Sequence, residues 1–298
     1  MDVLKTMRVG AVASFAGIPK DLPREKMPDH VIDKAIEHGL DVAQVMVPAN
    51  MPDAYYDALR GKCEEHGIEL DVGATMTLFE LTGDKAAQAR QDLKDMVRVM
   101  KKLNAVIMRR GYGRLSYETS RFNLAWPYEQ HMQFLIDNLK EAAKILAPEG
   151  IYLAIENHCD FKGTEHAEIF KAVGSPFVGC ALDTANGFTV YCDPIDEVRA
   201  LAPYTITTHI KDMVVRRDKG WRIPFYPSGC ALGEGNAEAE KAVRIIAENS
   251  PHAKGLHLIV ENGWVEYEEG VTDEQKAAIS KEMYLKGIRF LKNLTGKN

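Results

Sequence analysis

Eight short apolar segments, separated by amphipathic ones, restrict the fold of this chain more than any other feature. Each segment suits a strand buried on both faces. They are Met7–Ser14, Val42–Val47, Leu70–Thr75, Ala105–Met108, Ile151–Ile155, Val178–Leu182, Thr205–His209 and His257–Val260. Strands that alternate with helices form parallel sheet with helical crossovers. Eight units in 298 residues have the size of a closed (β/α)8 barrel, so we expect one TIM-barrel domain over residues 1–298.

The segments between the strands carry hydrophobic residues at helical spacing. Two examples are Leu93, Met96, Val97, Met100 and Leu103, and Leu135, Leu139, Ala142, Ala143 and Leu146. Near the C-terminus, residues 272–275 (TDEQ) form a capping-box sequence, which predicts the start of a helix with Ile279, Met283 and Phe290 on its apolar face. A doubly wound open sheet is the alternative fold. Residues 13–17 (ASFAG) lack the GxGxxG pattern that would favour it.

The charge, the cysteines and the apolar stretches of the chain disfavour several classes of protein. The net charge of −6 and the absence of a long basic run disfavour a nucleic-acid partner. Five cysteines without a CxxC pair fit free thiols in a reducing compartment, which predicts a cytoplasmic location. The apolar stretch Val9–Ile18 resembles a signal peptide, but Ser14 and Gly17 interrupt it and favour a first barrel strand. No stretch has the length of a transmembrane helix, so no membrane partner is expected.

Two connections are longer than usual for this fold. One spans residues 111–126 (GYGRLSYETSRFNLAW) after the fourth strand, and the other spans residues 213–236 after the seventh, with the sequence GWRIPFYP at 220–227. Loops that follow barrel strands surround the catalytic face. Their aromatic residues and arginines suit the walls and lid of a polar ligand site. Ordinary surface excursions or subunit contacts explain them equally well.

Four strands in succession end in a side chain that can bind a metal. Glu156 ends the fifth apolar segment, Asp183 the sixth and His209 the seventh, and Glu261 follows the eighth. In a barrel, these positions open on the same face. Three carboxylates that converge there repel each other, and a divalent cation would compensate the charge. Three oxygen ligands and one imidazole suit Mn2+ best, with Mg2+, Co2+ or Zn2+ as alternatives.

Two further residues lie two positions beyond expected ligands and therefore on the same side of their strands. His158 follows Glu156 at this spacing, either as an acid or base beside a substrate or as a histidine that orients a carboxylate. Lys211 follows His209 at the same spacing. Its ammonium reaches either a substrate oxygen or a neighbouring acid.

Other candidates for substrate binding come from strand ends and loops. Arg109 or Arg110 either clamps a hydroxyl or carboxylate or forms an ion pair at the rim. Tyr112 and Trp264 suit apolar walls of a sugar site, with core packing as the competing interpretation. The Gly-Glu-Gly sequence at 233–235 either cradles an anion or simply leads into the next helix.

Five motifs of the second half carry a family resemblance. They are the Glu in IEN (155–157), the Asp in LDTAN (182–186), the His in HIKD (209–212), Gly-Glu-Gly (233–235) and the Glu in VEN (260–262). With its barrel pattern, the chain resembles the xylose isomerase-like superfamily of sugar phosphate isomerases and epimerases. That group includes keto-sugar 3-epimerases, hydroxypyruvate isomerase, inosose dehydratase and dehydroshikimate dehydratases. The resemblance implies that Glu156, Asp183, His209 and Glu261 are the metal ligands.

The resemblance also implies an activity. It predicts a metal-dependent isomerase or epimerase that acts on a keto-sugar or related polyol through an enediolate. Glu156 and Glu261 are then the acid–base pair, and His158 competes as the base. The alternative is a lyase of the same superfamily, a dehydratase or a 3-keto-sugar deglycosylase, with His158 as general base. A non-catalytic sugar-binding barrel is a third hypothesis, which the complete ligand set disfavours.

Two positions depart from the family pattern. Several epimerases have a histidine where this chain has Asn186, and a glutamate where it has Lys162. The match to the tagatose-type epimerases is therefore poor where substrate binds. Endonuclease IV, another relative, needs additional histidines for three zinc ions, and Asn186 replaces one of them. We therefore expect a small carbohydrate as the partner, and family members often form dimers or tetramers.

Overall fold

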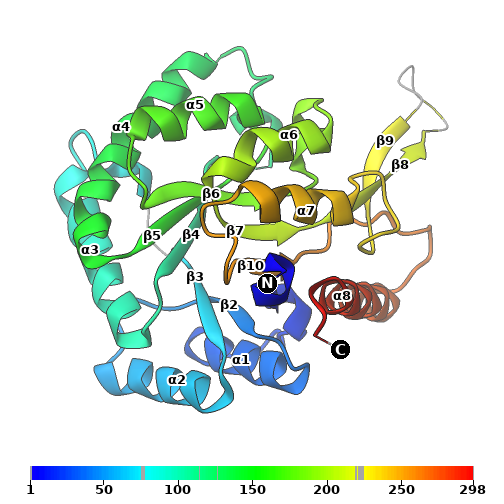
Figure 1. Cartoon of the computed structure of the whole chain (residues 1–298), viewed down its shortest axis with the longest axis horizontal. Helices are drawn as coiled ribbons and strands as arrows, with labels where there is room; N and C mark the ends of the chain where they lie inside the picture. The colour runs from blue at the N-terminus through cyan, green and yellow to red at the C-terminus, as the bar shows by residue number, and fades with distance from the viewer. Residues whose placement is uncertain are drawn as a thin grey trace.

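The computed structural model describes residues 2–74, 78–113, 115–125, 127–218, 220 and 225–297. Within these residues, eight parallel strands close into a barrel in the order β1-β10-β7-β6-β5-β4-β3-β2 (Figure 1). They are β1 Arg8–Ala11, β2 Val42–Met46, β3 Glu69–Gly73, β4 Ile107–Gly111, β5 Tyr152–Glu156, β6 Val178–Asp183, β7 Thr205–Ile210 and β10 His257–Val260. The predicted (β/α)8 barrel is confirmed.

Two strands differ from their expected bounds. β1 ends at Ala11 rather than Ser14, because Ala13–Ala16 forms a 3-10 turn. β4 starts two residues later than expected and continues to Gly111, so both arginines of that segment belong to the strand. Thr75, the expected end of the third strand, lies outside the described residues.

The helices surround the barrel (Figure 1). They are α1 Met27–Glu37, α2 Asp53–His66, α3 Ala86–Leu103, α4 Tyr128–Leu146, α5 Gly163–Val173, α6 Pro194–Leu201, α7 Ala239–Asn249 and α8 Asp273–Thr295. The apolar faces predicted for α3 and α4 are buried in the hydrophobic core. Among the described helices, none is both long and apolar enough to cross a membrane.

The last helix confirms one prediction and corrects another. The Thr272 hydroxyl accepts a hydrogen bond from Gln275 N, and the Gln275 side chain accepts one from Thr272 N, as in a capping box. The predicted apolar face is correct only in part, because Phe290 packs against the core but Ile279 is 41% exposed. The buried face consists of Tyr284, Gly287, Ile288, Leu291 and Thr295. A Cβ on Gly287 would lie 2.7 Å from Val260 Cγ1, so a glycine allows this face to approach β10 closely.

A two-stranded hairpin follows the seventh barrel strand. β8 (Asp212–Arg217) and β9 (Phe225–Cys230) pair antiparallel and extend away from the barrel (Figure 1). The sequence predicted a long loop here and not a hairpin. Residues 221–224, the core of the expected lid, lie outside the described residues.

Strand register brings the site together. Glu156 of β5 is level with Gly111 of β4, and Asp183 of β6 is level with His209 of β7. Because all barrel strands run parallel, these positions share the C-terminal face.

Candidate metal centre and active site

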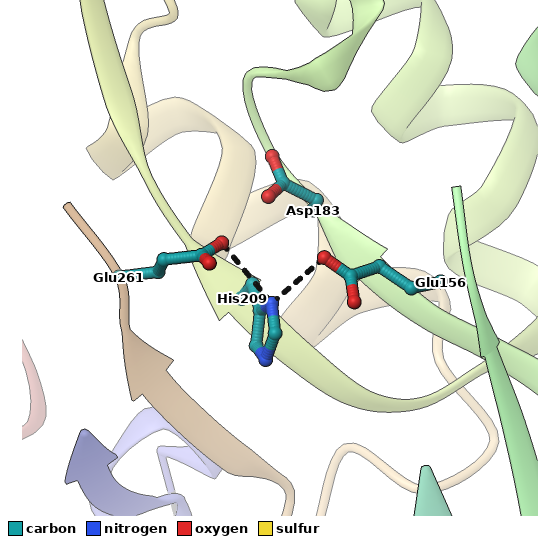
Figure 2. A group of neighbouring side chains, drawn as sticks. All are labelled: Glu156, Asp183, His209 and Glu261. Carbon is teal, nitrogen blue, oxygen red and sulfur yellow. Dashed lines mark hydrogen bonds and ion pairs between the residues drawn. The ribbon is translucent and has the colours of Figure 1, made fainter. Parts of the chain in front are cut away.

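Four side chains converge at the C-terminal end of the barrel strands. Glu156 ends β5, Asp183 ends β6, His209 lies in β7 and Glu261 directly follows β10. Each offers one potential ligand atom, and these atoms lie within 4.8 Å of one another. Figure 2 shows the carboxylates of Glu156 and Glu261 pointing toward the His209 ring from opposite sides, with the Asp183 carboxylate beside them. The residues that the sequence predicted to meet are therefore brought together.

The donor set fits a divalent cation. Nδ1 of His209 lies 2.9 Å from Glu156 Oε1 and 3.1 Å from Glu261 Oε2. Within the described part of the chain, Asp183 Oδ2 and Glu261 Oε2 are buried yet accept no hydrogen bond of good geometry. Both meet the ammonium of Lys211 as an ion pair, at 2.7 Å and 3.2 Å. Buried carboxylate oxygens without hydrogen bonds, beside an imidazole nitrogen, are the donors that Mn2+ or Mg2+ would take.

Burial and mutual charge shift the pKa of each group. Burial alone would raise the pKa of Glu156, but His209, His158 and Arg109 hold it well below its usual range. Burial opposes the charged form of His209, yet Glu156 and Glu261 raise its pKa to about 10. Burial raises the pKa of Asp183 to about 6, although Lys211 opposes the shift. Protonated His209 and Lys211 therefore balance the carboxylates in this structure.

Asn157 holds the backbone of Asp183, and two backbone N–H groups hold one oxygen of its carboxylate. Asn157 accepts a hydrogen bond from Asp183 N at 2.8 Å and donates one to Asp183 O at 3.1 Å. Asp183 Oδ1 accepts from the backbone N–H groups of Ala185 and Asn186. Its other oxygen, Oδ2, is therefore left to face the cluster. The Asn186 side chain also accepts from Lys211 Nζ at 3.1 Å, so it links the two groups.

The Gly-Glu-Gly segment does cradle an anion, and that anion belongs to the chain. The Asp212 carboxylate accepts hydrogen bonds from the backbone N–H groups of Met213, Gly233, Gly235 and Ala237 at 2.9–3.1 Å. A Cβ on Gly235 would collide with this carboxylate. The motif therefore anchors the connection between β9 and α7 beneath the hairpin, and both sequence interpretations hold in part.

A cavity of about 430 Å³ opens above the cluster. Its lining includes Glu156, His209 and Glu261 of the cluster, and also His158, Lys211, Arg109, Trp264, Gln44, Met46 and Leu115. The lining thus combines charged groups with apolar side chains. This combination suits a small polar ligand with one less polar face.

Two residues predicted to lie near the metal ligands, His158 and Arg109, both contact the carboxylate of Glu156. Nε2 of His158 lies 3.3 Å from Glu156 Oε1, and its Nδ1 lies 3.2 Å from Tyr112 O. Arg109 Nη1 lies 2.5 Å from the other oxygen of Glu156. Both side chains therefore orient Glu156 and also face the cavity, which leaves both interpretations of His158 open.

Trp264 and Tyr112, the two predicted apolar walls, differ in their surroundings. Trp264 is 47% exposed and lines the cavity, with Lys211 Nζ 4.9 Å from its ring centroid. Tyr112 is buried instead, stacked on Phe161, and its hydroxyl lies 2.9 Å from His131 Nδ1. Its ring is outside the described lining of the cavity, so its contacts are those of core packing.

Arg110 and Lys162 also have other partners. Arg110 Nη1 donates to Ala74 O at 2.9 Å. Lys162 precedes α5, and its backbone N–H donates to Glu165 Oε2, which caps that helix. Neither side chain is among the described residues that line the cavity.

Sequence reasoning missed Gln44. Its Oε1 lies 3.1 Å from His209 Nε2, beneath the cluster. The signal was present, because an amide side chain in the middle of the buried segment VAQVM needs a hydrogen-bond partner.

Comparison with known proteins agrees with this architecture. A family model described as "Xylose isomerase-like TIM barrel" matches residues 32–294. The structure resembles a xylose isomerase-like TIM barrel protein from Mycobacterium smegmatis in complex with magnesium, with a TM-score of 0.69 and 17% identity over 99% of this chain and 100% of that one. No curated protein matches the sequence.

Two enzymes share the fold with similar TM-scores and sequence identities. D-psicose 3-epimerase from Clostridium cellulolyticum H10, solved with D-tagatose, has a TM-score of 0.65 and 15% identity over 96% of this chain and 99% of that one. The probable 3-DHS dehydratase AsbF from Bacillus anthracis has a TM-score of 0.64 and 12% identity over 96% and 99%. At such identities the likeness concerns the fold alone. Since the family model covers most of its length, the chain belongs to the xylose isomerase-like TIM barrel family.

Proposed function

We propose that the protein is a divalent-metal-dependent isomerase or epimerase that acts on a keto-sugar or related polyol through an enediolate. The observation that carries the proposal is the convergence of three carboxylates and one imidazole within 4.8 Å at the base of a cavity of sugar size. The fold shared with D-psicose 3-epimerase supports the substrate class.

Glu156, Asp183, His209 and Glu261 would hold the cation, with Mn2+ foremost and Mg2+, Co2+ or Zn2+ as alternatives. A bound divalent cation would polarise the substrate carbonyl and a neighbouring hydroxyl, which acidifies the adjacent C–H. The Mycobacterium smegmatis relative was crystallised with magnesium, which supports a hard, oxygen-preferring ion.

Two carboxylates are placed for proton transfer. Glu156 and Glu261 flank the His209 ring, and each has a pKa held below the usual range despite burial, mainly by His209. Both are therefore ionised and able to accept a proton at neutral pH. Glu261 is the more accessible, with 25% of its side chain exposed against 5% for Glu156. A carboxylate that removes the proton would become the acid that returns it to the neighbouring carbon, which would isomerise the sugar. Epimerisation would require the other carboxylate to take a proton from solvent before it donates to the opposite face.

Substrate contacts would come from the cavity wall. The Trp264 ring is exposed toward the cavity and suits the apolar face of a sugar. Arg109 and Lys211 would reach substrate oxygens, provided that their ion pairs with Glu156 and Asp183 loosen. Tyr112 would support this wall from behind through its backbone contact with His158.

A lyase is the second candidate, and the setting of His158 favours it. Both ring nitrogens of His158 face acceptors, Glu156 Oε1 and Tyr112 O. Burial opposes the charged ring, but Glu156 raises its pKa and so stabilises the ring once it has taken a proton. After serving as general base in its neutral form, such a histidine can return the proton to a departing β-substituent. The fold shared with a probable dehydratase supports this alternative.

Incubation of the Mn2+-loaded protein with ketoses in D2O distinguishes the two reactions. Deuterium in a rearranged sugar, without loss of water or aglycone, supports an isomerase or epimerase. A conjugated ketone or a released aglycone supports the lyase.

Glu261→Gln should remain folded yet lose more than about a thousandfold in turnover. Glu240→Gln, on the exposed face of α7, is the matched control, and unchanged turnover of Glu261→Gln with metal in excess would reject the proposed role.

A further inference from the structure

Two buried polar side chains lie beneath the cluster, inside the barrel. Gln44 of β2 is 4% exposed and Asp71 of β3 is fully buried. The two are level with each other in the strand register, and Gln44 Nε2 lies 3.3 Å from Asp71 Oδ1. On its other side, Gln44 Oε1 lies 3.1 Å from His209 Nε2. Gln44 therefore connects the proposed metal ligand to a buried carboxylate.

The chemistry of the three groups leaves one arrangement of hydrogens. An ionised carboxylate only accepts hydrogen bonds, so the edge of Gln44 that faces Asp71 must be its NH2 group. The opposite edge, which faces His209, is then the carbonyl oxygen. An oxygen acceptor requires a donor, so Nε2 of His209 carries hydrogen. Nδ1, which faces Glu156 and Glu261, is then the nitrogen that can release its proton and bind a cation.

Contacts of Asp71 with Thr207 and His257 stabilise its ionised form. Thr207 Oγ1 donates to Asp71 Oδ2 at 2.6 Å, and His257 Nδ1 lies 3.6 Å from the same oxygen. His257 Nε2 in turn lies 2.8 Å from Glu69 Oε2. Burial would raise the pKa of Asp71, but the nearby charge of His257 and the hydrogen bond from Thr207 lower it. The carboxylate thus stays an acceptor and keeps Gln44 in one orientation.

We infer that Gln44, aimed by Asp71, is a positioning residue that holds the His209 ring with hydrogen on Nε2 and Nδ1 free for the metal. This inference rests on the proposed metal site and adds to it the residues that select the ligand nitrogen. Without Gln44, Nε2–H loses its acceptor, and the ring is free to turn or to change tautomer. Loss of such a partner typically weakens metal affinity by about 10- to 100-fold.

Calorimetric titration with Mn2+ tests the inference on the folded protein. Gln44→Met keeps the side-chain length but removes the acceptor, and it should bind Mn2+ about 10- to 100-fold more weakly. Gln44→Glu again offers an oxygen to Nε2–H and can share a proton with Asp71, so it should recover most of the affinity. Equal weakening in both variants would attribute the loss to packing and overturn the inference, as would unchanged affinity in Gln44→Met.

Two adjacent threonines of β7 give a matched pair that leaves Gln44 in place. Thr207 and Thr208 are both fully buried, but Thr207 donates to Asp71 and Thr208 donates to the His257 carbonyl. Thr207→Val should weaken Mn2+ binding several-fold more than Thr208→Val. Equal affinities of the two variants would contradict the role of Asp71.

A third variant separates this inference from the proposed metal site. His209→Ala should abolish Mn2+ binding. If the wild type itself binds no Mn2+, the metal site fails, and the inference fails with it. If the wild type binds, His209→Ala does not, and Gln44→Met binds as tightly as the wild type, only the positioning role fails. In the Mg2+-loaded wild type, 15N spectra of labelled histidine should show a hydrogen on Nε2 of His209, and a hydrogen on Nδ1 instead would overturn the assignment.

Discussion

The Lys211 ammonium lies 2.7 Å from Asp183 Oδ2, within the group of side chains proposed to hold a metal. The same nitrogen lies 3.2 Å from Glu261 Oε2, and the residue is only 3% exposed. The Lys211 backbone is held by Thr184, whose hydroxyl donates to Lys211 O and accepts from Lys211 N. Burial opposes the charge on this amine, but Asp183 and Glu261 raise its pKa. The lysine therefore neutralises two of the oxygens that a cation would bind.

Lys211→Met should tighten metal binding. Removal of the positive charge leaves the carboxylates unbalanced, and a divalent cation then gains free energy by binding them. We expect Mn2+ affinity to rise by about tenfold, which corresponds to 1.4 kcal/mol, in a calorimetric titration. Turnover should fall in the same variant if the ammonium also binds a substrate oxygen. Lys171→Met, on the exposed side of α5, is the control, and weaker Mn2+ binding in Lys211→Met would contradict the competition.

Metal affinity should rise with pH. His209 is protonated at neutral pH because Glu156 and Glu261 raise its pKa to about 10 against the effect of burial. The metal-free protein binds this proton and the metal-bound protein does not, so a higher pH favours the metal complex. Release of one proton gives a slope of about tenfold in affinity per pH unit. Below pH 6, protonation of Asp183, whose pKa burial raises to about 6, should weaken binding further.

Titrations at pH 7.5 in two buffers that differ in ionisation enthalpy measure the protons released. We expect about one proton per Mn2+ bound. Identical binding enthalpies in the two buffers, together with a flat pH profile, would show that His209 is already neutral.

Gly111→Ala should displace His158 and leave Glu156 held by Arg109. The His158 ring packs on Gly111, and a Cβ there would come within 3.0 Å of its Nδ1 and closer still to Cε1. The ring cannot retreat freely because Tyr112 O and Glu156 hold it from two sides. We expect turnover to fall by about tenfold or more while Mn2+ affinity stays within about threefold of the wild type.

The control for that variant is Gly61→Ala in α2, where an added Cβ meets no atom within 4 Å. This change should leave turnover intact and stabilise the helix by about 0.5–1 kcal/mol in denaturant unfolding. Full turnover in Gly111→Ala would show that the reaction does not depend on the placement of the His158 ring.

Asp212→Asn should destabilise the fold at the Gly-Glu-Gly segment. The amide has one acceptor oxygen where the carboxylate has two, and its NH2 group would face backbone donors such as Gly233 N and Gly235 N. Loss of charge-assisted hydrogen bonds and the new donor–donor contact should cost about 2 kcal/mol or more in the free energy of unfolding. Asp137→Asn, on the exposed face of α4, should change it by less than about 0.5 kcal/mol. Equal stabilities of the two variants would argue against the anchoring role of Asp212.

The barrel and its four converging side chains could be predicted because both follow from local patterns. A buried strand shows as an apolar segment of limited length, and parallel strands place all their C-terminal ends on one face. Glu156, Asp183 and His209 therefore had to lie near one another once the strands were assigned. The capping box at Thr272 was also local, because its hydrogen bonds join residues three positions apart.

Side-chain partnerships across the barrel were decided by the tertiary structure alone. Gln44 and His209 are 165 positions apart, and only barrel closure and strand register bring them to 3.1 Å. Tertiary structure also decided that the Asp212 carboxylate accepts hydrogen bonds from the Gly-Glu-Gly segment. It decided as well that the Tyr112 ring stacks on Phe161 in the core. Periodicity in a sequence encodes which face of an element is buried. It does not encode which distant side chain meets that face, because that depends on the relative placement of elements and on the rotamers that packing permits.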